Sequence, residues 1–512
     1  MKGFQRFLLL MGIVQLIVIA YYTSRYLSSG WQERNASGTD VYSKSLMRNL
    51  KQAFPGRQGE AVSEMLKTFS DVMQSSIQEL IKAREHLLRQ PYDSQCYPNG
   101  TLRILSAQHD QNYFEEAKQE PCIFTTVIPK TSLRKALDMF HWYRYGMMSN
   151  SCELLQQTVD KRNEGKPSYK PKCDNNPDIS WRKMTNLTLY PLHVGLPKYF
   201  TITGPEVPLG YVHVIKNGIV TGNGDTFCGS SEIRIQRCGN KLTKSKKPTK
   251  ITGHFTEVFS LSQYWGSGFF HFSIENLPRI FPYLQFLLKY DSIKIHVKST
   301  GGLTKKYMTY IGIAESRLVT GNVYADIVYL PNGSPCGRTS LLNIHYQSLF
   351  FRNTLHNVTN SSRNGIVLIQ RSSKRWFKKH NAILKSLQTL AQDYNLTAKV
   401  FSDKKLPSVG DTIQLFNEAF LVVAPHGAGN SNLMFSEPGT VLVEGLCQPV
   451  VPAYVELTQS LAHRYYGIIY SKSGKTCFDY DVSDIIPPAC QAIAMLKGEK
   501  DIQTGVCATK VR

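Results

Sequence analysis

Apolar residues form a run at the start of the chain in which only Gln15 is strongly polar. Residues 7–22 read FLLLMGIVQLIVIAYY, and Lys2 and Arg6 precede them. A run of this length is close to the shortest segment that spans a bilayer core. A cleavable signal peptide has a shorter apolar stretch that ends at small residues, which the Ala-Tyr-Tyr ending fits poorly. We therefore expect an uncleaved anchor at residues 7–22, with residues 1–6 in the cytosol and the rest of the chain in the lumen.

A helical pattern follows the anchor. Residues 28–58 are polar, whereas apolar residues recur at three- and four-residue steps between residues 60 and 89, which predicts a helix. This helix either packs on the main body or forms a coiled coil that dimerises the protein through a stem. The heptads are few and Ser76 interrupts them, which favours packing. We assign residues 23–95 to the stem and keep the dimer as the alternative.

Strand-like and helical segments alternate after residue 250. Short apolar runs at residues 366–370, 419–424 and 441–444 are typical of buried parallel strands. Residues 277–290 and 381–394 have the spacing of helices. Such alternation predicts an α/β fold built on a doubly wound sheet.

The composition indicates a folded, basic protein. Hydrophobic residues make up 42% and charged residues 19% of the 512 residues, so the chain can bury a core. The formal net charge of +22 favours anionic partners such as phosphates, acidic glycans and membrane headgroups. The luminal placement argues against nucleic acid. Basic residues gather between residues 234 and 250, either as a solvated loop or as a contact for an acidic acceptor or a membrane surface.

Cysteines and glycosylation sequons agree with a luminal position. None of the eleven cysteines forms a CxxC pair, which favours disulfides over a zinc site. N-x-S/T sequons begin at Asn35, Asn99, Asn186, Asn332, Asn357, Asn360 and Asn395.

A glycine turn follows the predicted strand at 419–424. It reads Pro-His-Gly-Ala-Gly-Asn-Ser-Asn over residues 425–432. Glycines let the backbone approach a ligand closely, and the start of the following helix attracts an anion. Ligands of open α/β sheets bind at the carboxyl ends of strands, where this turn lies. A purely structural turn is the alternative, because glycine turns after strands are common.

Basic residues follow the predicted strand at 366–370. Arg371 comes directly after it and Arg375 four residues later. Guanidinium groups bind phosphate oxygens in a bidentate manner, so Arg371 at the strand end is a candidate phosphate ligand. The alternative is a solvated basic loop.

A histidine and a glutamate share one helical face further upstream. His271 and Glu275 are four residues apart in the segment GFFHFSIENLPRI. A carboxylate that orients an imidazole raises its basicity, so the pair is a candidate general base. A buried hydrogen bond that only stabilises the helix explains the pattern equally well.

Metal-ligating patterns are weak. Asp479-Tyr480-Asp481 has the letters of the DxD motif, an acidic pair that can hold a metal ion, but it is far from the glycine turn in sequence. We interpret it as a chance match and expect no metal site.

Together, three segments resemble glycosyltransferase family 61. They are GFFHFSIENLPRI, LIQRSSKRWFKKHN and APHGAGNSNLMFSEPGTVLVE, within residues 250–450. Members include plant xylosyl- and arabinosyltransferases and animal enzymes that add N-acetylglucosamine to glycoproteins. The resemblance implies a GT-B fold, in which two Rossmann-like halves face a cleft. It assigns residues 96–360 to an acceptor-side domain and 361–512 to a nucleotide-sugar-binding domain.

The resemblance also implies roles for individual residues. Arg371 and Arg375 would hold the donor diphosphate, and Glu444 would reach the donor ribose. One of His271 and Glu275 would deprotonate the acceptor. The donor loop would consist of His426, Gly427, Ala428, Gly429 and Asn432. Asn430 and Ser431 stand where many members have Leu-Thr, which leaves the donor sugar open among N-acetylglucosamine, xylose and arabinose.

The sequence thus predicts an inverting glycosyltransferase of the Golgi or endoplasmic reticulum membrane. Its donor would be a UDP-sugar, its acceptor a glycan or glycoprotein, and it would require no cofactor or metal. The alternative is a luminal glycan-binding or scaffolding protein on the same fold, without catalysis.

Overall fold

The computed structural model describes the greater part of the chain after residue 70. The described residues are 71–89, 103–106, 122–127, 187–190, 210–235, 248–356, 363–447, 453–470 and 479–497, with short gaps inside some of these ranges. The predicted anchor at 7–22 and most of the basic segment at 234–250 lie outside them. Within this set of residues, no helix is both long and apolar enough to cross a bilayer.

Residues 77–89 form a helix, as their apolar spacing predicts. Ile77, Leu80 and Ala83 are buried along one side of it. From the same helix, Arg84 donates two hydrogen bonds to the carboxylate of Glu257, at 2.7 and 2.8 Å. The helix therefore packs on the main body, inside the compact unit that runs from Asp71 to Arg512. This is the alternative that the sequence favoured over a coiled coil, and it places part of the assigned stem in the body.

The first of two sheets is mixed. Its strand order is β1-β6-β5-β4-β10-β7-β8-β9, and β2 also pairs with β4. The pairs β10–β7, β7–β8 and β8–β9 are parallel, whereas β4 runs antiparallel to β10, β5 and β2. The strands are β1 (Arg103–Ser106), β2 (Ile123–Val127), β4 (Tyr211–Val220), β5 (Thr226–Cys228), β6 (Ser231–Arg234), β7 (Gly253–Ser260), β8 (Lys294–His296), β9 (Leu318–Val319) and β10 (Val323–Pro331). Parallel pairing is thus concentrated on one side of this sheet.

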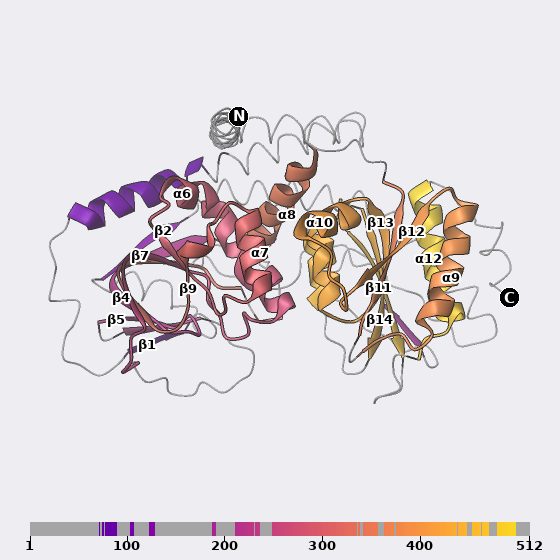
Figure 1. The fold of residues 1–512 in the computed structure, drawn as a ribbon, viewed down its shortest axis with the longest axis horizontal. Helices are drawn as coiled ribbons and strands as arrows, with labels where there is room; N and C mark the ends of the chain where they lie inside the picture. The colour runs from indigo at the N-terminus through magenta and orange to yellow at the C-terminus, as the bar shows by residue number, and fades with distance from the viewer. Residues whose placement is uncertain are drawn as a thin grey trace, which may run out of the picture. The chain divides into compact units, whose positions relative to one another are not determined.

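The second sheet is a doubly wound parallel sheet. Its order is β12-β11-β13-β14-β15-β3, and only the last pair is antiparallel. Figure 1 shows α9 and α12 on one face of this sheet and α10 on the other. The strands are β11 (Gly365–Gln370), β12 (Thr397–Ser402), β13 (Ala419–Pro425), β14 (Val441–Cys447), β15 (Arg464–Tyr470) and β3 (Leu187–Tyr190). The helices are α9 (His380–Asp393), α10 (Val409–Asn417), α11 (Ala453–Ser460) and α12 (Val482–Lys497).

Buried apolar strands explain why this sheet has helices on both faces. Every residue of β13 is buried, and β11 is buried except at its last residue. A strand that is apolar on both sides needs a covering layer on each face. The three apolar runs in the sequence correspond to β11, β13 and β14, and the predicted helix at 381–394 corresponds to α9.

The helix predicted at 277–290 is divided into two pieces. Leu277–Tyr283 forms the 3₁₀ helix η4, and Leu284–Lys289 forms α6. Pro278 and Pro282 lie inside this segment. Proline has no N–H to donate and clashes with the preceding turn, so a continuous α-helix is disfavoured there.

Aromatic side chains connect helices that accompany the two sheets. Tyr307 of α7 (Gly302–Tyr310) stacks on Phe435, with ring centroids 6.3 Å apart at an angle of 13°. Phe351 of α8 (Leu341–His356) meets the same Phe435 edge-on at 5.0 Å. Phe435 ends η6 (Ala428–Phe435), the 3₁₀ helix that follows β13. The α/β class is confirmed, whereas a GT-B arrangement stays a prediction.

Two sequons and three disulfide-bonded cysteines fall on described residues. Asn395 is exposed in the turn between α9 and β12, whereas Asn332 is buried. Cys122, Cys336 and Cys490 are disulfide-bonded. Only Asn395 of these two asparagines has the accessibility that glycosylation requires.

Three buried histidines make stability depend on pH. Burial lowers the pKa of His213 to about 3, of His296 to about 4 and of His463 to about 3. In the unfolded chain a histidine has a pKa of about 6.5. Below that pH the unfolded state takes up protons that the native state does not, so stability falls as the pH falls from about 6.5 towards 4.

We therefore expect a marked loss of stability between pH 7 and pH 5. Each of the three histidines contributes roughly 2 kcal/mol of the loss at pH 5, which urea unfolding at the two pH values would measure. His463→Gln keeps a donor for the carbonyl of Leu433, which Nε2 of His463 contacts at 3.0 Å. This variant should lose about a third of the histidine contribution, and an unchanged pH dependence would contradict the assignment.

Candidate active site

The strand order of the second sheet places two predicted segments together. The chain passes from β11 outward to β12, and then returns to the other side of β11 to form β13. Connections therefore leave β11 and β13 in opposite directions and open a crevice at the carboxyl ends of these two strands, where α/β proteins bind ligands. Arg371 follows β11 there, and His426 follows β13.

Arg371 packs directly on the glycine turn. Its Nη1 donates a hydrogen bond to the backbone carbonyl of His426 at 2.9 Å. A Cβ on Gly427 would lie 1.8 Å from that same Nη1, so the glycine makes room for the guanidinium. Burial and the charge of neighbouring Arg375 lower the pKa of Arg371. Since no carboxylate among the described residues forms an ion pair with Arg371, its positive charge is available for an anion.

Glu444 lies beneath the turn and holds it. One carboxylate oxygen contacts Nδ1 of His426 at 2.8 Å and accepts a hydrogen bond from Asn430 at 3.0 Å. The other accepts a hydrogen bond from the hydroxyl of Tyr465 at 2.6 Å. Glu444 is completely buried, so a contact with a donor ribose would have to replace one of these three. In this structure its carboxylate orients the His426 ring and fixes the loop.

The remaining loop residues form the first turns of η6. Asn432 donates a hydrogen bond to the carbonyl of Gly429 at 3.0 Å. A Cβ on Gly429 would lie 3.0 Å from a methyl group of Ile369, so the turn packs closely against β11. Ala428 begins η6 and is partly exposed, whereas Asn430 and Ser431 are completely buried.

Arg375 has a more open position than Arg371. It is exposed, and its backbone φ of 63° is in the left-handed region that residues other than glycine rarely adopt. Its positive charge is one of the causes that lower the pKa of Arg371, after burial.

His271 and Glu275 lie on a turn of π-helix, η3 (His271–Asn276). Nδ1 of His271 contacts one carboxylate oxygen of Glu275 at 3.0 Å, and the other oxygen accepts the backbone N–H of Gly337 at 2.7 Å. Glu275 is buried, whereas His271 is partly exposed. Nε2 of His271 has no hydrogen-bond partner within the described part of the chain. Both oxygens of Glu275 are thus engaged, and His271 is the member of the pair that can receive a proton.

The sulfur of Cys336 lies near the same pair. Ligand atoms of His271, Glu275 and Cys336 are within 4.8 Å of one another. Cys336 is disulfide-bonded, so it has no thiolate to offer a metal ion. We therefore do not interpret this cluster as a metal site.

Tyr454 connects the two histidines, and the sequence did not predict it. Its ring meets His426 at 5.3 Å between centroids and Phe270 at 5.6 Å, both edge-on. Phe270 precedes His271 and contacts its ring at 5.3 Å. The candidate base and the glycine turn thus share one aromatic cluster. Tyr454 lies on α11 in an ordinary helical pattern, so the sequence carries no signal of this role.

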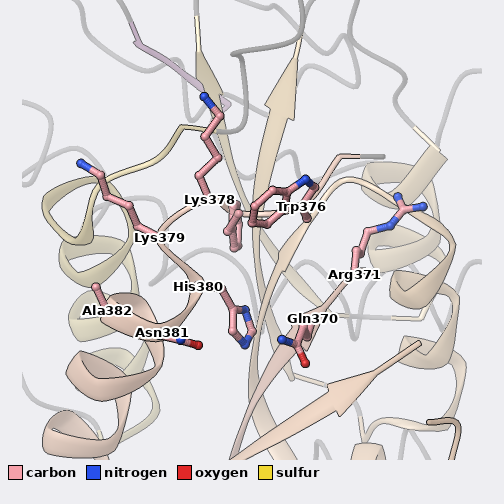
Figure 2. Close-up of a pocket in the computed structure, with 9 residues that line it drawn as sticks. Gln370, Arg371, Trp376, Lys378, Lys379, His380, Asn381 and Ala382 are labelled. Carbon is pink, nitrogen blue, oxygen red and sulfur yellow. The ribbon is translucent and has the colours of Figure 1, made fainter. Parts of the chain in front are cut away.

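A pocket of about 300 Å³ opens beside Arg371, between the end of β11 and the start of α9. Figure 2 shows Arg371 turned away from Lys378 and Lys379, whose amino groups point outward. Trp376 is exposed, and His380 is buried in the wall. The lining residues are Gln370, Arg371, Trp376, Phe377, Lys378, Lys379, His380, Asn381 and Ala382.

The Asp-Tyr-Asp segment lies near this pocket. Asp479 pairs with Lys378 at 3.5 Å, and Asp481 forms an ion pair with Lys379. Tyr480 between them is buried and donates its hydroxyl towards the carbonyls of β14 and β15. Both aspartates therefore have lysine partners.

The geometry defines a class of protein: an α/β protein with a basic crevice at the switch point of a doubly wound sheet and a histidine–glutamate pair beside it. Comparison with protein families then identifies the region. Residues 269–443 match the model of the family described as Glycosyltransferase 61, so the family resemblance is confirmed there. Comparison with curated proteins gave no match. The family supports glycosyltransferase activity.

Proposed function

We propose that the protein transfers a sugar from a UDP-sugar to a glycan or glycoprotein, with inversion at the anomeric carbon. One observation carries this proposal: Arg371 packs on the glycine turn of His426 at the sheet edge, and Tyr454 and Phe270 connect that turn to His271. We further propose that the reaction takes place in the lumen of the Golgi or endoplasmic reticulum, with an anchor at residues 7–22. The family match and the apolar N-terminal run support this.

The donor diphosphate fits the basic side of the crevice. Arg371 offers a half-buried guanidinium without a carboxylate partner among the described residues, and Arg375 adds a second positive charge nearby. In a partly buried site such charges stabilise a developing anion more strongly than they do in water. We assign the diphosphate to these arginines and the nucleotide to the pocket lined by Trp376. The stabilisation that these groups supply requires no metal in the proposed mechanism.

The acceptor is activated from the other side of the crevice. Nε2 of His271 takes the proton of an acceptor hydroxyl while Glu275 holds the ring through Nδ1. The acceptor oxygen forms a bond to the anomeric carbon, and the bond from that carbon to the diphosphate oxygen breaks. UDP leaves with the bonding electrons, and Arg371 and Arg375 stabilise its added negative charge.

Donor binding is tested by melting the purified protein with and without UDP, and by measuring UDP release from a panel of UDP-sugars. We expect UDP to raise the melting temperature of the native protein. Arg371→Gln removes the guanidinium, and Gly427→Ala displaces it, since the added methyl group would occupy its position. Both variants should lose the shift and reduce UDP release about 100-fold or more.

Lys385→Gln is the matched control, because it removes one exposed positive charge of α9 that does not line the pocket. It should behave as the native protein. Normal UDP release by Arg371→Gln would refute the donor assignment. Binding of glycans without any response to UDP would instead establish the non-catalytic alternative.

A further inference from the structure

An exposed pair of aromatic residues lies directly before the candidate base. Tyr264 is 40% exposed and Trp265 is 48% exposed, in the turn between β7 and η3. Their rings meet edge-on, with centroids 5.0 Å apart at 88°. Trp265 also lies over His271, with centroids 6.3 Å apart at 30°. Large aromatic side chains are usually buried, so an exposed tryptophan beside a candidate catalytic histidine requires an explanation.

The turn that carries Trp265 is tightly fixed to the π-helix. Gly266 and Gly268 donate backbone hydrogen bonds to the carbonyls of Gln263 and Trp265, each at 2.9 Å. A Cβ on Gly266 would lie 2.1 Å from the side-chain amide of Asn276, the last residue of η3. Gln263 in turn donates its side-chain amide to the carbonyl of Ser334 at 3.0 Å. The indole is therefore held in a defined position relative to His271, as a preorganised binding surface requires.

Resting on the proposed function, we propose that Trp265 is the platform for the acceptor and that the acceptor hydroxyl belongs to a sugar ring. A pyranose ring has a face of C–H groups that packs on an aromatic surface, while its hydroxyl groups point outward at the edge. With its ring on Trp265, such an acceptor presents an edge hydroxyl to Nε2 of His271.

A peptide acceptor fits this surface less well. Its backbone N–H and C=O groups need hydrogen-bond partners when they lose water, and an indole face offers none. A serine or threonine hydroxyl as acceptor is therefore the competing outcome. The two classes of acceptor differ in how strongly they depend on the indole ring.

The test compares the full-length native protein with Trp265→Ala and Trp265→Phe. UDP release is measured from the active UDP-sugar alone, and then with methyl glycosides of mannose, galactose, xylose and N-acetylglucosamine or with serine- and threonine-containing peptides. We expect a glycoside to stimulate release by the native protein. Trp265→Ala should raise the KM for that glycoside about 10- to 30-fold, with kcat changed less than about threefold. Trp265→Phe should recover most of the loss.

Three outcomes would overturn the proposal. The first is stimulation by peptides but by none of the glycosides. The second is no stimulation by any acceptor in a protein that hydrolyses the donor. The third is a fall in kcat and in acceptor-free hydrolysis after Trp265→Ala with an unchanged KM, because that would mean the indole only supports His271. These outcomes can be distinguished from a failure of the proposed function itself. In that case the native protein would show neither a UDP-dependent melting shift nor UDP release. Leu406→Ala, an exposed apolar residue elsewhere, is the control.

Discussion

Replacing His271 with alanine should lower kcat by about 10²- to 10⁴-fold while leaving UDP binding intact. The range is that of a general base in enzymes. His271 has the geometry of such a base, because Nδ1 is held by Glu275 at 3.0 Å and the ring is partly exposed. Steady-state UDP release at saturating donor and acceptor measures the loss, and the UDP-dependent melting shift confirms an intact donor site.

Two further variants make this result specific. Glu275→Gln keeps a side chain of the same shape but removes the charge that orients the imidazole, so its loss should be smaller than that of His271→Ala. His254→Gln replaces an exposed histidine of β7, outside the aromatic cluster that joins His271 to the glycine turn, and should be neutral. Full activity in His271→Ala would transfer the role of base to another group, of which His426 with its Glu444 partner is the nearest equivalent.

Replacing Arg84 with alanine should destabilise the protein by about 3–5 kcal/mol. The variant leaves the carboxylate of Glu257 buried without its cationic partner, which is the costly way to break a buried ion pair. Glu257 is 5% exposed and Arg84 only 17%, so solvent screens this pair weakly. The hydroxyl of Tyr329 still donates to Glu257 at 2.7 Å, but a neutral donor does not neutralise the charge. The free energy of unfolding in urea measures the effect.

The matched controls distinguish the contribution of the buried ion pair to stability from that of the helix on which Arg84 lies. Arg84→Met combined with Glu257→Gln removes both charges, so the double variant should recover much of the stability that the single variant loses. Arg89→Ala breaks an exposed pair with Glu85, at 4.0 Å, and should cost less than about 1 kcal/mol. A loss below about 1 kcal/mol for Arg84→Ala would show that residues 77–89 are not firmly held on the first sheet.

Local sequence patterns predicted the strands of the crevice well. The apolar runs at 366–370, 419–424 and 441–444 correspond to β11, β13 and β14, because a buried parallel strand is a nearly continuous apolar run and is recognisable from a few residues. Because these strands are recognisable from sequence, the basic and glycine-rich segments that follow them could be predicted to lie at strand ends. The contact between Arg371 and His426 then follows from the order of the strands.

Other features depend on contacts between distant segments and could not be predicted from local patterns. Glu444 was predicted to be a ribose ligand at the end of a strand, yet it lies inside β14 and is occupied by partners from η6 and β15. Tyr454 has the pattern of any core residue of a helix. The division of 277–290 into η4 and α6 was readable from its prolines, but the π-turn before it was not, since it has the same His-Glu spacing as an α-helix.

The antiparallel strand at the border of the second sheet has a consequence for how the protein is made. β3 comes from residues 187–190 and pairs with β15, so the sheet formed mainly after residue 363 is completed by a segment translated far earlier. A fragment that starts at residue 361 would leave β15 with an unpaired edge, open to association with other chains. The early segment must therefore wait for its partner during synthesis, and the part of the chain after residue 361 is a poor candidate for independent expression or for exchange between related proteins.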